Sequence, residues 1–213
     1  MAQMGRPRTF DRDAAIEQAL RLFWEQGYES TSLSQLKAAI GGGISSPSFY
    51  AAFGSKAALF QECAERYLST HAKVTDSLWD KTLPPRQALE TTLRRSARMQ
   101  CDPRHPKGCM VALGTMSAPS PEFAAVTAPL ARSRARTRTG IKACIERGVA
   151  EGALPADTDV AALATLFNSF LLGLSTLARD GVGLAAMDAA ISQAMRLWDG
   201  AAARPSGRKP RQA

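Results

Sequence analysis

Residues 45–56 have the pattern of a very short helix, and they read Ser45-Ser46-Pro47-Ser48-Phe49-Tyr50-Ala51-Ala52-Phe53-Gly54-Ser55-Lys56. A serine can cap the start, a proline is harmless in the first turn because no N–H is needed there, and a glycine follows the end. Phe49 and Phe53 are four residues apart and supply one apolar face. The other face carries small and polar side chains, which suits contact with the major groove of DNA.

A second helix is expected just before this one, and a third directly after it. Ser32 and Gln35 have the spacing of a capping box, and the apolar residues Leu36 and Ile40 follow. Ser55 can cap a helix that places Lys56 in its first turn. A helix, a glycine-containing turn, a short helix and an immediate restart predict a helix-turn-helix at about residues 32–54.

At these positions the chain resembles the TetR family of transcriptional regulators. The resemblance covers about residues 9–69 and rests on Gly27-Tyr28, on Ser48-Phe49-Tyr50 with Phe53, and on Gly54-Ser55-Lys56 with Leu59-Phe60. It implies an all-α fold of about nine helices. An N-terminal three-helix DNA-binding domain would span residues 9–69, and a larger effector-binding and dimerisation domain would span residues 70–200.

The resemblance also implies which residues meet DNA. Thr31 and Ser32 would lie at a phosphate, and Tyr50 and Lys56 would hold the DNA backbone. The residues in or beside the groove would be Ser45, Ser46, Pro47, Ser48, Ala51 and Ala52. Taken singly, each has a simpler interpretation as a cap, a packed aromatic or a solvated charge. The chain also departs from the family pattern in Gly41-Gly42-Gly43, which lengthens the turn, and in the two alanines, which stand where many members carry aromatic or histidine side chains.

Both ends of the chain are basic. Arg6 and Arg8 flank a proline and resemble a minor-groove arm, although a disordered solubilising start explains them equally well. Residues 201–213 are expected to form a basic disordered tail. The net charge of +8 and the pI of about 9.7 suit a polyanionic partner without identifying one.

The composition bears on the size of the core, on the cellular compartment and on a possible membrane span. The 213 residues are 45% hydrophobic, which is enough for a full core. Four cysteines without close pairing, and a start without an apolar segment, predict a cytoplasmic protein. Residues 160–178 carry no charge and approach the length of a membrane span, but polar residues dilute them and the apolar ones repeat at helical spacing. A buried helix is therefore expected, and no membrane partner, metal or cofactor.

Cys109 begins a short apolar helix after a proline-rich break. A helix N-terminus favours the thiolate, so Cys109 is a candidate sensor and Cys101 a candidate resolving partner. The Gly108-Cys109 start also resembles one branch of the TetR family in which this helix lines the effector cavity. Candidate apolar lining residues are Met110, Leu113, Met116, Phe123, Phe167 and Phe170. Packing as ordinary core residues, with the cysteine as a small filler, is the competing interpretation.

Three further features of the C-terminal region bear on assembly and signalling. The last two helices carry more apolar residues than one buried stripe needs, and the family resemblance implies a four-helix bundle between two copies. The candidate dimer residues are Phe170, Leu174, Leu177, Ile191, Met195 and Trp198. A helix from Ser55 toward Trp79 is expected to link head and body. The alternating Arg132, Arg134, Arg136 and Arg138 are expected to be solvated.

The primary hypothesis is a homodimeric repressor that binds a palindromic double-stranded operator and is released by a small effector. Two half-sites about 34 Å apart make such a protein sensitive to head separation. An alternative within the same fold is a redox or electrophile sensor that acts through Cys109. Two less favoured alternatives are a helical adaptor that does not bind DNA and a thiol enzyme. For the enzyme, His71 and His105 are the available bases, and neither has a recognisable catalytic context.

Overall fold

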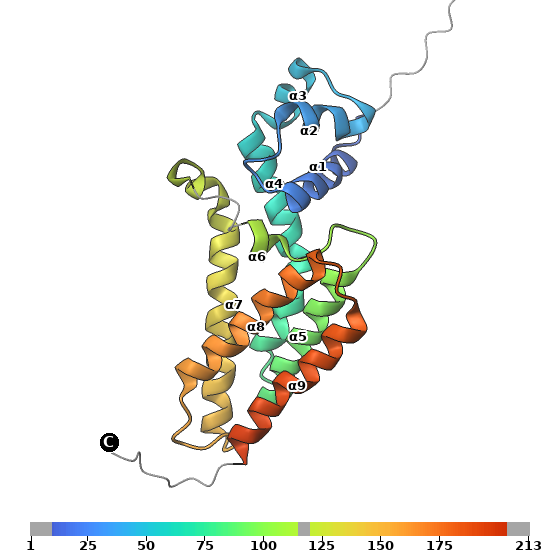
Figure 1. Ribbon diagram of the computed structural model, residues 1–213. Helices are drawn as coiled ribbons and strands as arrows, with labels where there is room; N and C mark the ends of the chain where they lie inside the picture. The colour runs from blue at the N-terminus through green and yellow to red at the C-terminus, as the bar shows by residue number, and fades with distance from the viewer. Residues whose placement is uncertain (1–9, 115–119, 204–213) are drawn as a thin grey trace, which may run out of the picture.

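The computed structural model describes residues 10–114 and 120–203. Within those ranges the chain folds into nine α-helices and three 3-10 segments, without a strand (Figure 1). This confirms the all-α expectation. Arg6, Arg8, Met116 and residues 204–213 of the basic tail lie outside the described residues.

The head lies at one end of the molecule and comprises the first four helices (Figure 1). They are α1 (Arg12–Gln26), α2 (Leu33–Ala39), α3 (Ser46–Phe53) and α4 (Lys56–Ser69), with the 3-10 segment η1 (Ile40–Gly42) after α2. Each of these helices begins after a residue whose side-chain oxygen accepts a hydrogen bond from a backbone N–H of the first turn, which confirms the predicted caps Ser32, Ser45 and Ser55. The capping residues are Asp11, Ser32, Ser45 and Ser55.

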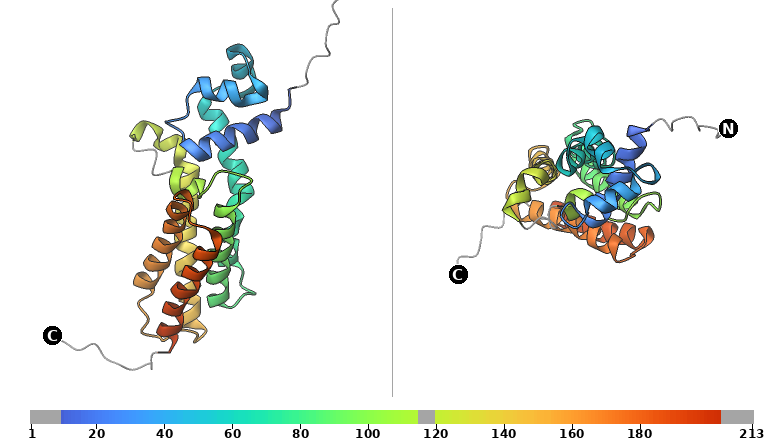
Figure 2. Two further views of the ribbon diagram at one scale, coloured as in Figure 1. Left: turned by 45° about the vertical axis from the view of Figure 1, so that its right-hand side comes forward. Right: turned by 90° about the horizontal axis from the view of Figure 1, so that it is seen from above.

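The body consists of longer helices that run roughly along the long axis of the molecule (Figure 2). Its elements are η2 (His71–Trp79), α5 (Pro85–Cys101), α6 (Met110–Gly114), η3 (Pro121–Phe123), α7 (Ala124–Ala150), α8 (Val160–Arg179) and α9 (Leu184–Ala202). Asp159 caps α8 by accepting a 2.9 Å hydrogen bond from the Ala162 N–H. The short α6 lies between the head and the body (Figure 1).

The link between head and body differs from the expectation of one helix from Ser55 toward Trp79. The α-helix α4 ends at Ser69, because Thr70 has backbone angles of φ −124° and ψ −84° that no α-helix accommodates. A 3-10 segment then continues to Trp79. No proline or glycine marks this break, so the local sequence does not signal it.

Two hydrophobic clusters form the core, and they do not divide at residue 70. The head cluster contains the buried faces of α1 to α4, and it also contains Met110 and Val111 of α6 and Leu130 of α7. The second cluster fills the body between η2, α5, α7, α8 and α9. Parts of α6 and α7 are therefore packed as part of the head.

Four of the candidate dimer residues lie inside a single protomer, which corrects that expectation. Leu174, Ile191, Met195 and Trp198 are at most 2% exposed and belong to the body cluster. Their side chains fill the space between α8, α9 and the rest of the body, so they present no surface to a second copy. Phe170 is half-buried and Leu177 is 39% exposed, so only these two of the six remain on the surface.

Candidate nucleic-acid interface and effector cavity

The short helix α3 is anchored by its two phenylalanines and capped by a serine. Phe49 and Phe53 are 0% and 4% exposed. The Ser45 Oγ accepts a 3.2 Å hydrogen bond from the Ser48 N–H and lies 2.8 Å from the Ser48 Oγ. Gly54, with φ at +71°, donates its N–H to the Tyr50 carbonyl at 2.8 Å and ends the helix.

The opposite side of α3 faces solvent. We define the outer face of α3 as Ser45, Pro47, Ser48, Tyr50 and Ala51, all of which are exposed. Ser46 is half-buried, and its Oγ accepts a 2.8 Å hydrogen bond from the Lys37 ammonium. Ala52 is half-buried and packs against the head cluster, so it helps to anchor α3 and is not part of the outer face.

Thr31 does not present its hydroxyl to a phosphate, which corrects the expectation. The residue is fully buried, and its Oγ1 donates a 2.6 Å hydrogen bond to the Gly27 carbonyl. It fixes the turn between α1 and α2. Ser32 is exposed and forms the predicted capping box with Gln35, through hydrogen bonds of 3.1 and 2.7 Å. At the N-terminus of α2, Ser32 is therefore accessible to a phosphate, whereas Thr31 is not.

Lys56 is held against the head by an aromatic ring. Its ammonium lies 4.4 Å from the centroid of the Tyr28 ring. Burial lowers the pKa of Lys56, and the nearby Glu29 carboxylate opposes that shift. The side chain is half-buried.

The three glycines between α2 and α3 adopt backbone angles that suit glycine alone. Gly41, Gly42 and Gly43 have φ values of +61°, +78° and +120°. The Gly41 N–H donates a 2.9 Å hydrogen bond to the Gln18 side chain on α1. The Ile44 N–H donates one of the same length to the Lys37 carbonyl. The longer turn is thus tied to α1 and α2 and still delivers α3 with its outer face in solvent.

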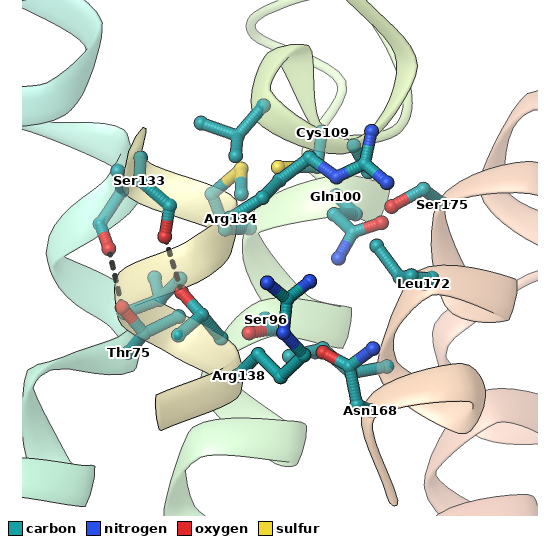
Figure 3. Close-up of a pocket in the computed structure, with 17 residues that line it drawn as sticks. Thr75, Ser96, Gln100, Cys109, Ser133, Arg134, Arg138, Asn168, Leu172 and Ser175 are labelled. Atoms are coloured by element: carbon teal, nitrogen blue, oxygen red, sulfur yellow. Dashed lines mark hydrogen bonds between the residues drawn. The ribbon is translucent and has the colours of Figure 1, made fainter. Parts of the chain in front are cut away.

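The body contains a cavity of about 60 Å³ between η2, α5, α6, α7 and α8 (Figure 3). Apolar residues from four of these elements line part of it, including Val74, Met99, Val111 and Leu172. The polar lining includes Ser96, Gln100, Arg134, Arg138, Asn168 and Ser175. At about 10–15 Å³ of probe-occupied space for each water, this cavity holds about four to six water-sized groups.

Two arginines point into the cavity from one face of α7. Arg134 and Arg138 are one helical turn apart and both line it (Figure 3). Among the described residues that line the cavity there is no Asp or Glu. Gln100 and Ser175 are only 2% and 1% exposed, and the Gln100 Oε1 and the Ser175 Oγ are buried without a hydrogen-bond partner. Buried polar atoms of this kind are uncommon in folded proteins.

Among the predicted ligand residues that the structure describes, only Cys109 lines this cavity. Met110 and Phe167 are completely buried in the two core clusters. Phe123 packs against Tyr28 with ring centroids 5.4 Å apart, and Leu113 and Phe170 are not among the lining residues. The arginines were expected to be solvated: Arg132, Arg136 and Arg138 are exposed, whereas Arg134 is half-buried, and Arg134 and Arg138 also line the cavity. Their four-residue spacing was the available signal, but only the packing of α7 decides which flank faces inward.

The two candidate redox cysteines face different environments. The Cys109 thiol accepts a 3.3 Å hydrogen bond from the Tyr67 hydroxyl. Burial raises its pKa, and this outweighs the opposing effects of Tyr67 and of the backbone N–H groups of Ala112 and Val111. The expected thiolate-favouring helix start is therefore overcome by desolvation. The Cys101 sulfur lies 3.7 Å from the Val182 carbonyl and 3.5 Å from the Met187 sulfur, outside the cavity.

A network of hydrogen bonds joins the cavity to the head. The Tyr67 hydroxyl, at the end of α4, accepts a 3.2 Å hydrogen bond from the Met110 N–H. The indole N–H of Trp24 on α1 donates a 3.1 Å hydrogen bond to the Gly108 carbonyl. The Arg179 guanidinium, at the end of α8, donates to the carbonyls of Trp24, Glu25 and Lys107 at 2.6–2.8 Å. Residues 107–110 are thus bonded to both head helices that reach the body.

The surface of α8 and α9 carries a second candidate interface. Leu166, Leu177 and Leu197 are 40%, 39% and 48% exposed. The helix α8 has a mean hydropathy of 1.7 over its most apolar window, which is high enough for a membrane span, and only 28% of that window is buried. Gly173 lies on this surface with no heavy atom within 4 Å of the position of an added Cβ. We define the α8–α9 face as Leu166, Phe170, Gly173, Leu177 and Leu197.

The chain is similar to known regulators along most of its length. Residues 15–63 match the family described as bacterial regulatory proteins of the tetR family, and residues 85–198 match the tetracyclin repressor-like C-terminal domain. The HTH-type transcriptional repressor ComR of Escherichia coli is 31% identical over 195 residues, which cover 91% of each chain. The repressor BdcR of the same organism is 35% identical over 113 residues, covering 53% of this chain and 56% of BdcR.

A solved structure extends this similarity to a DNA complex. A cysteine-substituted form of the TetR family transcriptional regulator CifR, complexed with 26-bp double-strand operator DNA, is 38% identical and superposes with a TM-score of 0.78. The match covers 91% of this chain and 100% of that one.

Proposed function

Because this chain belongs to the TetR family of transcriptional regulators, we propose that it represses transcription by binding operator DNA through the outer face of α3. A small effector that fills the cavity releases the DNA. The relatives ComR and BdcR are transcriptional repressors, and CifR is solved with operator DNA. Regulation in the cytoplasm is the corresponding setting.

The exposure of α3 carries this proposal. Its two phenylalanines are buried, while Tyr50 is 51% exposed at the surface of the head. A tyrosine hydroxyl can donate to a phosphate, and serine hydroxyls and an alanine methyl can meet base edges or a thymine methyl group. The capping box leaves Ser32 exposed at the N-terminus of α2, where the helix dipole favours a phosphate.

Operator affinity tests this assignment. An operator is first selected from a pool of duplexes with the full chain, and binding is then measured by gel shift at several salt concentrations. Ala51→Glu places a negative charge on the outer face of α3, so we expect at least about a tenfold loss of affinity. Ala150→Glu is the matched control, since Ala150 is an exposed alanine at the end of α7 far along the body. Equal affinities for the two variants would remove α3 from the interface.

Dimerisation through the α8–α9 face completes the proposal. Residues 160–178 carry no charge, and the open position of Gly173 allows close approach of a second backbone. A two-fold dimer presents two heads to two half-sites about 34 Å apart. The apolar surface of α8 is therefore explained by a second copy of the chain, without a membrane.

The cavity is placed to control the heads. An effector changes operator affinity only if it binds the two head arrangements differently. Cys109, Val111 and Ala112 line the cavity, while the neighbouring Met110 N–H is bonded to Tyr67 on α4. A displacement of α6 by the effector would therefore be passed to α4 and α1 through Tyr67 and Trp24.

A second candidate trigger is covalent modification of Cys109. Its thiol lines the cavity, so an electrophile that enters it would meet this sulfur. The raised pKa means that little thiolate is present at neutral pH, and modification is expected to accelerate as the pH rises. Operator release by an electrophile is compared between the wild type and Cys109→Ser. Equal release in both would exclude this trigger and leave the reversible effector.

A further inference from the structure

We infer that the effector is a small hydroxycarboxylate, that is, a carboxylate of about four to six non-hydrogen atoms that also carries a hydroxyl group. This inference rests on the proposed function, since it names the ligand class of the same cavity. Three features lead to it, namely the charge of the lining, the buried polar atoms and the available space.

The charge of the lining calls for an anion. Arg134 and Arg138 extend guanidinium groups into the cavity from one side of α7 (Figure 3). No carboxylate accompanies them among the described lining residues, and Arg138 has no hydrogen bond or ion pair within the described chain. Two like charges one helical turn apart at the cavity raise each other's energy, and a carboxylate between them relieves this. Guanidinium groups match the planar carboxylate geometry.

The buried polar atoms call for a hydroxyl group. Gln100 Oε1 and Ser175 Oγ are both buried and unpartnered, and both residues line the cavity. A carboxylate is an acceptor only, so it cannot pair with an amide oxygen. A hydroxyl both donates and accepts, so it pairs with the Gln100 amide in either orientation of its oxygen and nitrogen. Gln100, Ser175 and Arg134 all line this one cavity (Figure 3).

The available space limits the size of the effector. A cavity of about 60 Å³ corresponds to about four to six water-sized groups. Val111 and Leu172 give it an apolar side, which suits a short hydrocarbon portion and disfavours an inorganic anion. A carboxylate, one hydroxyl and one or two further carbons fill this volume, as in lactate.

Binding to the full chain without DNA provides the first test. Lactate, lactamide, propionate and inorganic phosphate are titrated at constant ionic strength by calorimetry. Lactamide lacks the charge, propionate lacks the hydroxyl, and phosphate lacks the apolar part. We expect lactate to bind at least about tenfold more tightly than each of the other three. Lactamide or propionate binding as tightly as lactate would overturn the inference, as would tighter phosphate binding or no lactate binding at all.

Matched variants assign the effect to the cavity. Arg138→Met should abolish the preference for lactate over lactamide. Arg136→Met should leave it unchanged, since Arg136 lies on the same helix but faces Asp76 at 3.5 Å and the Trp79 ring at 5.0 Å. Gln100→Leu should abolish the preference for lactate over propionate. Circular dichroism confirms folding, and Arg138 is exposed enough for its substitution to be tolerated. An unchanged preference in Arg138→Met would overturn the inference.

Operator binding separates this inference from the proposed function. We expect saturating lactate to weaken operator binding by at least about tenfold in wild type, a typical allosteric coupling. Operator binding that no lactate concentration alters would defeat the inference and leave the DNA-binding proposal intact. Tight lactate binding by a chain that binds no selected operator would defeat the DNA-binding proposal instead.

Discussion

At Gly108 the backbone before α6 lies very close to α6 and to α8. Its φ is +81°, and an added Cβ would lie 2.8 Å from a Leu113 methyl and 2.9 Å from the Ser175 carbonyl oxygen. A side chain there is strained by the backbone and also meets another backbone. The glycine therefore permits the start of α6 to lie against α8.

We predict that Gly108→Ala lowers the free energy of unfolding by about 1–3 kcal/mol more than the strained backbone angle alone would cost. Gly152→Ala is the matched control, because Gly152 has a similar φ of +73° but nothing within 4 Å of an added Cβ. Urea unfolding of both variants measures the difference. Equal losses would mean that the close approach at Gly108 relaxes without cost.

His71, at the start of η2 where the head meets the body, makes the stability of the protein depend on pH. Burial lowers its pKa, and His105 and Arg21 act in the same direction, while Glu17 and Asp102 oppose them. In the window just below the ordinary histidine pKa of about 6.5, the unfolded chain binds more protons than the folded one. The folded state is therefore not penalised by His71 above that window, and the free energy of unfolding decreases as the pH falls through it.

We therefore predict that the free energy of unfolding decreases between pH 7.5 and pH 6, with a smaller decrease in His71→Gln. Urea unfolding at half-unit pH intervals checks this. The range stays above the pKa values of carboxylates, so that their titration does not contribute. An identical pH dependence in both proteins would assign the effect to other groups.

At the scale of the elements, Arg179 holds the end of α8 to the end of α1. Its three hydrogen bonds go to backbone carbonyls, two of them on Trp24 and Glu25 at the C-terminal end of α1, where a positive charge is favourable. We predict that Arg179→Met lowers the free energy of unfolding by about 2 kcal/mol and accelerates amide exchange in residues 100–110.

Arg132→Met provides the control for this prediction. Arg132 is exposed on α7 and makes no hydrogen bond or ion pair within the described chain. Its substitution should leave both the unfolding free energy and the exchange pattern unchanged. Exchange in residues 100–110 that is insensitive to Arg179→Met would show that Trp24 and Tyr67 alone hold the junction.

The elements also show how far local sequence determines this fold. Asp11, Ser32, Ser45, Ser55 and Asp159 cap helices through bonds within three residues, so their positions were predictable. The break at Thr70 and the burial of Thr31 depend on packing and carry no local signal. The same holds for the cavity, because the inward flank of α7 is decided by its neighbours. The α3 residues were predictable from spacing, and the arginines of the cavity were not.

At the scale of the whole molecule, the α8–α9 face determines the oligomeric state. Leu177→Glu introduces a charge where an apolar surface should be covered, so we predict a shift from dimer to monomer and a loss of operator affinity of at least about tenfold. Sedimentation velocity and gel shift measure the two effects. The Ala150→Glu variant should remain dimeric. A dimer that persists in Leu177→Glu, and also in Leu166→Glu, would move the interface elsewhere.

Because Met110, Val111 and Leu130 complete the head cluster, the head is not an independent folding unit that ends at residue 69. A chimera that grafts residues 10–69 of this chain onto the body of a relative would join mismatched surfaces around α6. Transfer of operator specificity between such proteins should therefore succeed more often when α6 and the first turns of α7 are transferred together with residues 10–69. Exchanging only the exposed residues of α3 avoids the problem altogether.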